Sequence, residues 1–334
     1  MDAPVIVRIL AEEPAAWWDE VALRARSIWH TRDFARLHRE CGGTVRFLAA
    51  FRGATPTGVA LLLLGGSRKL PLLDILFARV ALVPDEPAAG DRESAIALLG
   101  GLLAEARRAR AAEASVRVEL PRFLDVPDLT ERGLAARRRG IALIEVPPDP
   151  AAVERGMAAP ARRQARKAAR LGVRVEVADG VEPLLPLLDL SFLRSGLPPR
   201  DHGYVRALDR CLPAEVLVAR KDGRDLAALL WVARGEMGLN IFHGRADGDV
   251  EGAPNLLHRE MLEQASRRGV RLLHTGDAAL PGETDPRILG ITRFKESLGF
   301  AIHPAFQGSI ALRPFSAGLR RRLLALRTGA GRRR

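Results

Sequence analysis

Only four of the 52 basic residues in this 334-residue chain are lysines, and one of them stands where it could do chemistry. Lys295 follows Phe294 in the run Gly290-Ile-Thr-Arg-Phe-Lys-Glu-Ser-Leu-Gly299. A lysine ammonium is compact and its pKa shifts readily on burial, so it can lie beside a reacting oxygen where arginine is less suited. The spacing alone is equally typical of a surface lysine on a short helix.

Basic residues gather in two further places. The block Arg162-Arg-Gln-Ala-Arg-Lys-Ala-Ala-Arg170 lies mid-chain, and eight arginines with no acidic residue follow from Arg313 onward. With a formal net charge of +12, such clusters suit phosphate-bearing partners: anionic lipid headgroups, nucleotides or RNA. Arg163, Arg166 and Lys167 are candidates for binding substrate phosphates by charge-assisted hydrogen bonds, and the alternative is a solvated helix face.

The composition argues against several other kinds of site. The two cysteines, Cys41 and Cys211, lie far apart, so we expect neither a disulfide framework nor a metal site. The sequence has no Gly-x-Ser-x-Gly nucleophile motif. We expect no signal peptide, and the apolar run Val59–Leu64 is much too short to cross a bilayer. A reducing, cytoplasmic setting is therefore predicted.

The hydrophobic pattern predicts the same order of elements twice: strand, two helices, three strands, helix, strand, helix, strand. In the first half the predicted elements are Val5–Leu10, Pro14–Arg26, Arg32–Glu40, Thr44–Phe51, Gly58–Leu64, Leu72–Leu82, Glu93–Ala111, Val116–Leu120, Asp128–Arg138 and Ile141–Val146. In the second half a basic helix, Pro160–Leu171, precedes the repeat, which ends with two strands, Ala301–Phe306 and Ser309–Leu312.

The repeated order indicates an internal duplication with a period of about 155 residues. It predicts an α/β fold with a mixed sheet, antiparallel in its early strands and with βαβ crossovers in its late ones. The expected domains are 1–150 and 151–315, followed by a basic tail, 316–334.

This order resembles that of GNAT domains, and two of them in tandem resemble the FemAB family. The resemblance covers about residues 5–312 and rests on five motifs in the family's order. They are Gly140–Asp149, Arg162–Glu176, Pro254-Asn-Leu-Leu257, Gly269–Asp277 and Gly290–Gly299 with its Arg-Phe-Lys triplet.

The resemblance implies acyl transfer to an amine. The best-known members of the family move an amino acid from aminoacyl-tRNA onto the peptide of a cell-wall precursor. For this chain it implies an acyl or aminoacyl donor, either acyl-CoA or aminoacyl-tRNA, and no bound cofactor. The acceptor would be an amine of a cell-envelope or polysaccharide precursor, either lipid-linked or free.

One departure from ordinary GNAT domains concerns the loop that holds the acyl-CoA pyrophosphate. The equivalent turn, Arg245–Ala253, carries three acidic residues, which would repel a pyrophosphate at a helix N-terminus. An acetyl-CoA-dependent N-acetyltransferase is therefore the second hypothesis. The third is a GNAT scaffold without catalysis that binds RNA or anionic lipid through its arginines.

The resemblance also implies roles for single residues. Lys295 would stabilise the oxyanion of the tetrahedral intermediate or relay a proton, and Phe294 would shape the wall beside it. Asp277 could position the amine, and its alternative is a helix N-cap or turn. Arg293 of the same triplet and His243 are further substrate-binding candidates.

Two helix residues and the tail complete the candidates. Asn255 is either a substrate contact or an N-cap, and His258 is expected on a helix face rather than as a base. The tail 316–334 alternates leucine with arginine, which predicts either contact with an anionic inner leaflet or a frayed helix that packs its leucines on the domain. The oligomeric state stays open.

Overall fold

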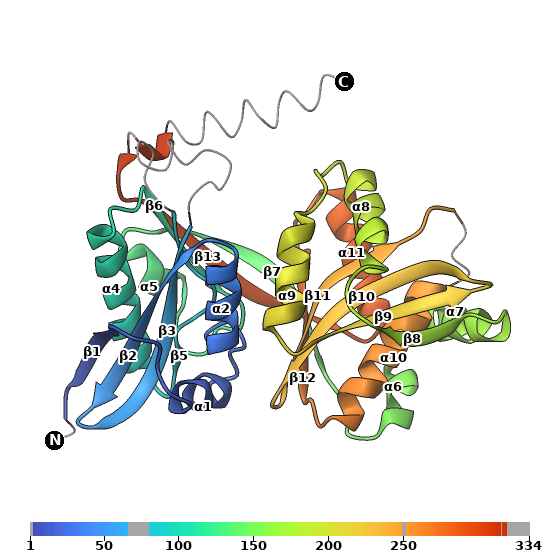
Figure 1. Ribbon diagram of the computed structural model, residues 1–334, viewed down its shortest axis with the longest axis horizontal. Helices are drawn as coiled ribbons and strands as arrows, with labels where there is room; N and C mark the ends of the chain where they lie inside the picture. Colours follow the sequence, from blue (N-terminus) through green and yellow to red (C-terminus); the bar gives the residue numbers. More distant parts are fainter. Residues whose placement is uncertain (1–2, 66–79, 249–251, 315, 319–334) are drawn as a thin grey trace. The chain divides into compact units, whose positions relative to one another are not determined.

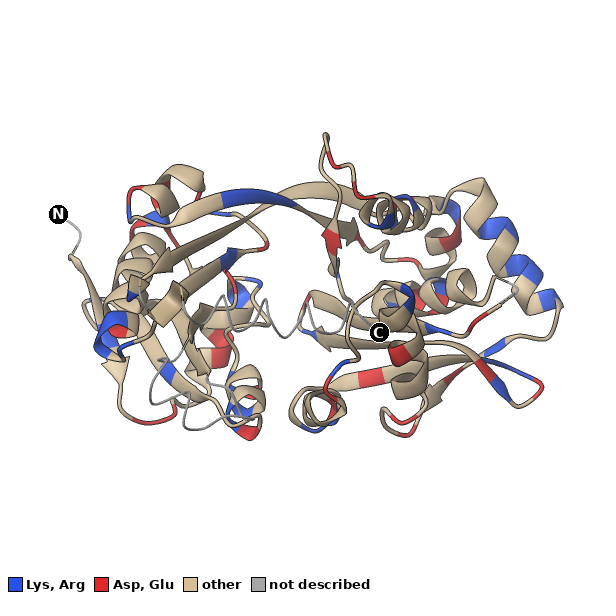
Figure 2. Cartoon of the chain, turned by 90° about the horizontal axis from the view of Figure 1, so that it is seen from above, with Lys and Arg blue, Asp and Glu red and all other residues tan. Residues whose placement is uncertain are grey.

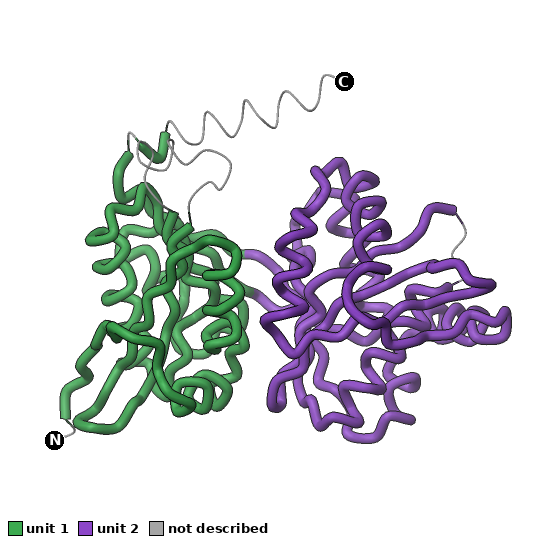
Figure 3. Tube along the Cα trace, in the orientation of Figure 1, with its two compact units in different colours: residues 1–138, 305–334 green, residues 139–304 purple. Residues whose placement is uncertain are grey.

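The structure is a computed structural model that describes residues 3–65, 80–248, 252–314 and 316–318. The chain forms two compact units, drawn in Figure 1 and separated by colour in Figure 3. Unit 1 consists of Met1–Arg138 and Ala305–Arg334, and unit 2 consists of Arg139–Pro304. Each unit has a mixed sheet with helices packed against it.

Unit 1 combines the first half of the chain with one strand from its end. Its sheet has the order β1-β2-β3-β4-β6-β13, and the short β5 pairs with β3. The strands are β1 (Val5–Leu10), β2 (Thr44–Arg52), β3 (Thr55–Gly65), β4 (Val80–Val83), β5 (Ala88–Ala89), β6 (Glu113–Val118) and β13 (Ala301–Ala311). The helices are α1 (Trp17–Arg24), α2 (Arg32–Glu40), α4 (Arg92–Arg108) and α5 (Val126–Thr130). Leucines of α4, including Leu98 and Leu102, fill the core against the sheet.

Unit 2 has a sheet of the order β7-β12-β11-β10-β9-β8. The strands are β7 (Ala135–Glu145), β8 (Arg174–Ala178), β9 (Ala214–Lys221), β10 (Arg224–Arg234), β11 (Met237–Arg245) and β12 (Leu272–Ala278). The helices are α6 (Pro150–Gly156), α7 (Ala159–Arg170), α8 (Leu184–Arg194), α9 (His202–Cys211), α10 (Ala253–Arg267) and α11 (Pro286–Ser297).

Helices cover both faces of the unit 2 sheet. Side chains of α6, α7 and α10 share one core cluster with β9 and β10, whereas α8 packs on β10 and β11. Neighbouring residues of β11 show the two faces directly. The ring of His243 contacts His258 of α10, whereas a Cβ added to Gly244 would lie 2.5 Å from the backbone of Leu187 in α8.

Two strands of unit 2 separate part-way along their length. β11 and β12 pair in parallel at only three positions, the last of which is Leu239↔His274. Beyond that point β11 continues beside β10, and β12 continues beside β7. The sheet therefore opens just after Leu239 and His274.

The predicted order of elements is confirmed. The second half runs β8-α8-α9-β9-β10-β11-α10-β12-α11-β13, and the described residues of the first half have the same order with β5 added. The last strand of each half is eleven residues long and contributes to both units. In unit 2, β7 pairs with β12, and in unit 1, β13 pairs with β6. The predicted domain boundary at residue 150 lies at the end of the first repeat. The compact units do not have this boundary, because unit 1 includes Ala305–Arg334 and unit 2 begins at Arg139.

Two local predictions are wrong. The helix predicted over Asp128–Arg138 ends at Thr130, and Gly133, at φ +79°, precedes a strand that begins at Ala135. The run Ala135–Arg139 has good helix formers, but pairing in the sheet overrides that weak preference. The two strands predicted around Gly308 are one strand, because this glycine allows close packing: a Cβ there would lie 3.1 Å from Leu134. Residues 72–79 of the predicted strand Leu72–Leu82 lie outside the described residues.

Candidate active site

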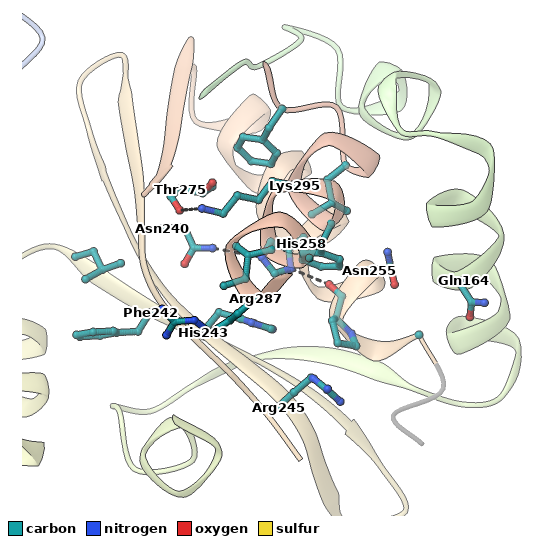
Figure 4. A pocket seen from close by; sticks show the side chains of 18 of the residues that line it. Gln164, Asn240, Phe242, His243, Arg245, Asn255, His258, Thr275, Arg287 and Lys295 are labelled. Carbon is teal, nitrogen blue, oxygen red and sulfur yellow. Dashed lines mark hydrogen bonds between the residues drawn. The ribbon is translucent and has the colours of Figure 1, made fainter. Parts of the chain in front are cut away.

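A cleft of about 740 Å³ lies in unit 2, where β11 and β12 separate (Figure 4). Its lining comes from β11, β12, α7, α10, α11 and the segments beside them. The polar lining residues are Gln164, Asn240, His243, Arg245, Asn255, His258, Thr275, Arg287 and Lys295.

Lys295 is held at the strand side of this cleft by two backbone carbonyls. Its Nζ donates hydrogen bonds to the carbonyl oxygens of Thr275, at 2.5 Å, and Asp277, at 2.7 Å. Figure 4 shows the side chain reaching from α11 toward Thr275. Two of the three N–H donors of a protonated lysine are thereby occupied, which leaves one for a ligand oxygen.

A bulge in β12 supplies those carbonyls. The register with β7 shifts between His274 and Asp277, so two residues of β12 lie opposite one residue of β7. Gly276 lies in the bulge at φ +75°, a left-handed conformation that glycine adopts without strain. The bulge interrupts the hydrogen-bond ladder between β12 and β7. At this interruption the carbonyl oxygens of Thr275 and Asp277 accept hydrogen bonds from Lys295.

Burial, and secondarily the charge of Arg139, lowers the pKa of Lys295 from 10.5 to about 8. The carbonyl acceptors stabilise the ammonium, but they do not replace its hydration fully. At pH 7, below this pKa, the side chain remains mainly protonated. It is therefore a positive charge in a poorly hydrated place.

The charged lining residues that the structure describes are all basic. They are Arg245, Arg287 and Lys295, and no aspartate or glutamate is among the described lining residues. A carboxylate oxygen of Asp285 lies 3.6 Å from the guanidinium of Arg287. The same carboxylate accepts a hydrogen bond from the backbone N–H of Arg287 and so caps the first turn of α11. The cleft therefore favours negative charge, whether on a ligand or developing during a reaction.

Three rings pack together on the helix side of the cleft. The centroid of His258 lies 4.9 Å from that of His243 and 5.2 Å from that of Phe294. Burial lowers the pKa of His258 from 6.5 to about 4 and holds the pKa of His243 well below 6.5. Both imidazoles are therefore neutral at pH 7.

The second half of the chain matches a known family. Residues 155–295 match the model of the acetyltransferase (GNAT) domain. This segment belongs to the GNAT superfamily. The cleft and Lys295 lie in this GNAT domain.

Solved structures share the fold over most of the chain. FemX has a TM-score of 0.72 and 14% identity, with 90% of this chain and 96% of that chain covered. The C-terminal domain of a putative lysylphosphatidylglycerol synthetase from Agrobacterium fabrum has a TM-score of 0.59 and 19% identity, covering 92% and 97%. A tandem GNAT protein from the clavulanic acid biosynthesis pathway has a TM-score of 0.58 and 17% identity, covering 92% and 98%. Among curated proteins, none has a significantly matching sequence. The chain thus has the tandem-GNAT fold.

The GNAT domain brings four of the predicted site residues together. Lys295, Phe294, His243 and Asn255 all line the cleft. Asn255 is not the N-cap of α10, because the helix begins after Gly252 at φ +76°. A Cβ on Gly252 would also lie 2.5 Å from the carbonyl oxygen of Gln164, so this position requires glycine.

Other predicted residues lie away from the cleft. Asp277 belongs to β12, where its exposed carboxylate pairs with Arg139 and its carbonyl oxygen accepts from Lys295. It is therefore not an N-cap or a turn residue. Arg293 is exposed and does not line the cleft.

The predicted phosphate-binding residues lie on the exposed face of α7. Figure 2 shows where lysine and arginine positions, in blue, occur along the ribbon. Arg163, Arg166 and Lys167 line a separate hollow with Arg170 and Arg259. Arg166 and Arg259 both pair with Glu154. Binding of phosphates here stays a prediction.

Sequence reasoning missed several cleft residues, of which Asn240 is the most informative. It is a buried amide in the otherwise apolar run Met237–Phe242 of β11, and that interruption was a usable signal. No comparable signal marked the other missed residues, because they are far apart in the sequence and become neighbours only in the folded chain. They are Gln164, Arg245, Thr275 and Arg287.

The turn before α10 and the tail are described only in part. Asp247 pairs with Arg194, whereas Asp249 and Glu251 lie outside the described residues. Of the tail, Ser316 and Ala317 are buried, and residues 319–334 are likewise outside. In the described part of the chain, no helix is both long and apolar enough to cross a membrane, and no three potential metal ligands come together.

Proposed function

We propose that this protein transfers an acyl or aminoacyl group onto an amine of a cell-envelope or polysaccharide precursor. The observation that carries the proposal is the ammonium of Lys295, fixed by two carbonyls at a cleft where every charged lining residue that the structure describes is basic. Aminolysis of an ester or thioester passes through a tetrahedral oxyanion, and a fixed cation stabilises that charge as it develops.

The reaction balances without a further reagent. The lone pair of the amine forms the new C–N bond, and the carbonyl π pair moves onto the oxygen beside Lys295. When the C=O bond re-forms, the C–O or C–S bond to the donor breaks. The leaving alkoxide or thiolate then takes up the proton that the amine nitrogen releases.

The structural relatives point to two classes of donor and acceptor. The first relative is a domain of a putative synthetase whose name describes a lysyl group joined to phosphatidylglycerol. The second relative is a tandem GNAT protein whose description refers to AcCoA. We favour an aminoacyl donor because of the acidic turn before α10. The ion pair between Asp247 and Arg194 neutralises one of those acids, which keeps acetyl-CoA as the second candidate.

The test uses the full-length protein with labelled acetyl-CoA or aminoacyl-tRNA and amine-bearing envelope precursors. Lys295→Met should lower turnover about 100-fold to 1,000-fold, the usual effect of losing one oxyanion donor. Lys221→Met, in the β9–β10 turn outside the cleft, is the matched control and should retain wild-type turnover. Full activity in Lys295→Met would refute the assignment. Calorimetry decides the donor, because micromolar binding of acetyl-CoA would favour the second candidate.

A further inference from the structure

A second hollow of unit 2, of about 640 Å³, shares a lining residue with the cleft, and we call it the α7 hollow. Its polar lining residues are Arg163, Gln164, Arg166, Lys167, Arg170 and Arg259. Gln164 also lines the cleft, and Figure 4 shows it on α7 beside the cleft. In α10, His258 lines the cleft and the next residue, Arg259, lines the hollow. One ligand can therefore occupy both hollows at once.

Three basic side chains of the α7 hollow have no counter-charge. Arg163, Lys167 and Arg170 are exposed and form no ion pair within the described part of the chain, whereas the other two arginines both pair with Glu154. The three follow one face of α7 over about 10 Å, at a rise of about 1.5 Å per residue. Like charges at this spacing repel one another, and bound anions relieve that repulsion. The hollow therefore favours a ligand with several negative charges in a row.

A membrane surface fits the α7 hollow less well than a narrow ligand does. A helix that lies on a bilayer inserts its apolar face, but the apolar face of α7 packs in the core of unit 2 through Ala161, Ala165 and Ala168. Only the basic face is left for a partner, and that face is concave. A chain of phosphate groups on a slender molecule matches both the shape and the charge.

We propose that the α7 hollow is the phosphate subsite of the acyl donor. Arg163, Lys167 and Arg170 bind phosphate groups at the nucleotide end of the donor by charge-assisted hydrogen bonds, and its acyl end passes Gln164 into the cleft. This inference rests on the proposed function and adds the place where the donor is held. Both classes of donor carry such phosphates, aminoacyl-tRNA along its 3′ strand and acyl-CoA in its nucleotide portion, so the experiment has one arm for each.

The first arm locates the 3′ end of an RNA on the full-length protein. A short single-stranded RNA that ends in CCA is oxidised with periodate at its last ribose, and the resulting dialdehyde condenses with a nearby lysine amine to an imine and water. Cyanoborohydride reduces the imine to a stable link, which peptide mass spectrometry locates. The chain has only the four lysines Lys69, Lys167, Lys221 and Lys295, and the link should form at Lys295 in the cleft.

The variant Arg163→Gln/Lys167→Gln tests the hollow in both arms. With the unoxidised RNA at about 0.1 M salt, fluorescence anisotropy should show about tenfold to thirtyfold weaker binding. The slope of log K against log salt should become shallower by about 1.4, which is about 0.7 for each lost phosphate contact. Arg24→Gln/Arg107→Gln is the matched control, because it removes the same charge at two exposed, unpaired positions of unit 1 and should bind like the wild type.

The second arm measures binding of adenosine 3′,5′-bisphosphate, the nucleotide end of CoA, by calorimetry with the same variants. Bisphosphate binding that depends on the hollow, without an RNA link at Lys295, supports the subsite and identifies CoA as the donor. An RNA link at Lys295 that the hollow variant loses supports the subsite and identifies RNA. In a transfer assay the hollow variant should raise KM for the donor about tenfold and change kcat less than about twofold, because these contacts are the same before and during the reaction.

The inference is overturned if the hollow variant and the control bind both probes equally, or if RNA links chiefly at another lysine and the bisphosphate does not bind. Vesicles of phosphatidylcholine with about one-quarter phosphatidylglycerol test the membrane, and hollow-dependent binding to them alone would equally overturn it. The two proposals fail separately. Hollow-dependent binding of a probe without transfer from any donor sinks the proposed function alone, whereas transfer with a donor KM that ignores the hollow sinks this inference alone.

Discussion

Nζ of Lys295 lies 2.5 Å from the carbonyl oxygen of Thr275, a group made available by the bulge at Gly276. The geometry of the cation therefore depends on a residue with no side chain. A Cβ on Gly276 would meet no atom within 4 Å, so substitution acts only through backbone strain at φ +75°.

Gly276→Ala should lower the free energy of unfolding by about 1 kcal/mol and turnover by at least 10-fold, because the strained bulge displaces both carbonyl acceptors. Gly282→Ala is the control, since Gly282 also has a positive φ and open space around it. Chemical denaturation and steady-state kinetics of both variants check this. Equal losses of activity in the two variants would show that the bulge has no particular role.

The pH profile should separate the two roles considered for Lys295. With a pKa of about 8 in the folded protein, the ammonium is lost as the pH rises through 8. A cation that stabilises an oxyanion then predicts kcat falling above pH 8, whereas a general base predicts kcat rising. Stability changes in the opposite sense: between pH 8 and 10.5 the unfolded chain holds more protons than the folded one, so this lysine disfavours folding less as the pH rises. Lys295→Met should remove both dependences.

Two buried histidines, one in each unit, should make the protein sensitive to acid. Burial lowers the pKa of His30 and of His258 to about 4, so the unfolded state binds more protons between pH 6.5 and 4. Each should therefore cost about 3 kcal/mol of stability as the pH falls through that window. His30→Gln and His258→Gln should each flatten the decline, which urea denaturation at a series of pH values measures. An unchanged slope in both variants would contradict the burial argument.

Asp277→Asn tests the role that the sequence predicted for this carboxylate. Its side chain is 74% exposed, pairs with Arg139 and does not line the cleft, so turnover should change less than threefold. Loss of the carboxylate leaves the charge of Arg139 unopposed, which should move the alkaline limb of the pH profile to a slightly lower pH. A fall in turnover as large as that of Lys295→Met would restore Asp277 as the residue that positions the amine.

The order of elements was predictable because each half alternates hydrophobic patterns with glycine and proline breaks. The strand at Ala135–Glu145 was predicted only from Ile141 onward, since the alanines and arginines of Ala135–Arg139 favour a helix locally and only pairing in the sheet decides otherwise. Lys295 stood out by its rarity. Asn240 was marked only by its interruption of an apolar run, and Thr275 by no signal. Their proximity depends on where two strands stop pairing, which no local pattern encodes.

The last strand of the second half, β13, pairs with β6 of unit 1, and this pairing has a consequence for biosynthesis. The edge of β6 is covered by Phe306–Ala311, which the ribosome makes only after the whole of unit 2. Unit 1 must therefore wait, with that edge open, until the residues of unit 2 have been synthesised, and open edges invite aggregation. A product that terminates before Ala305 would keep the cleft residues yet leave the other unit permanently incomplete.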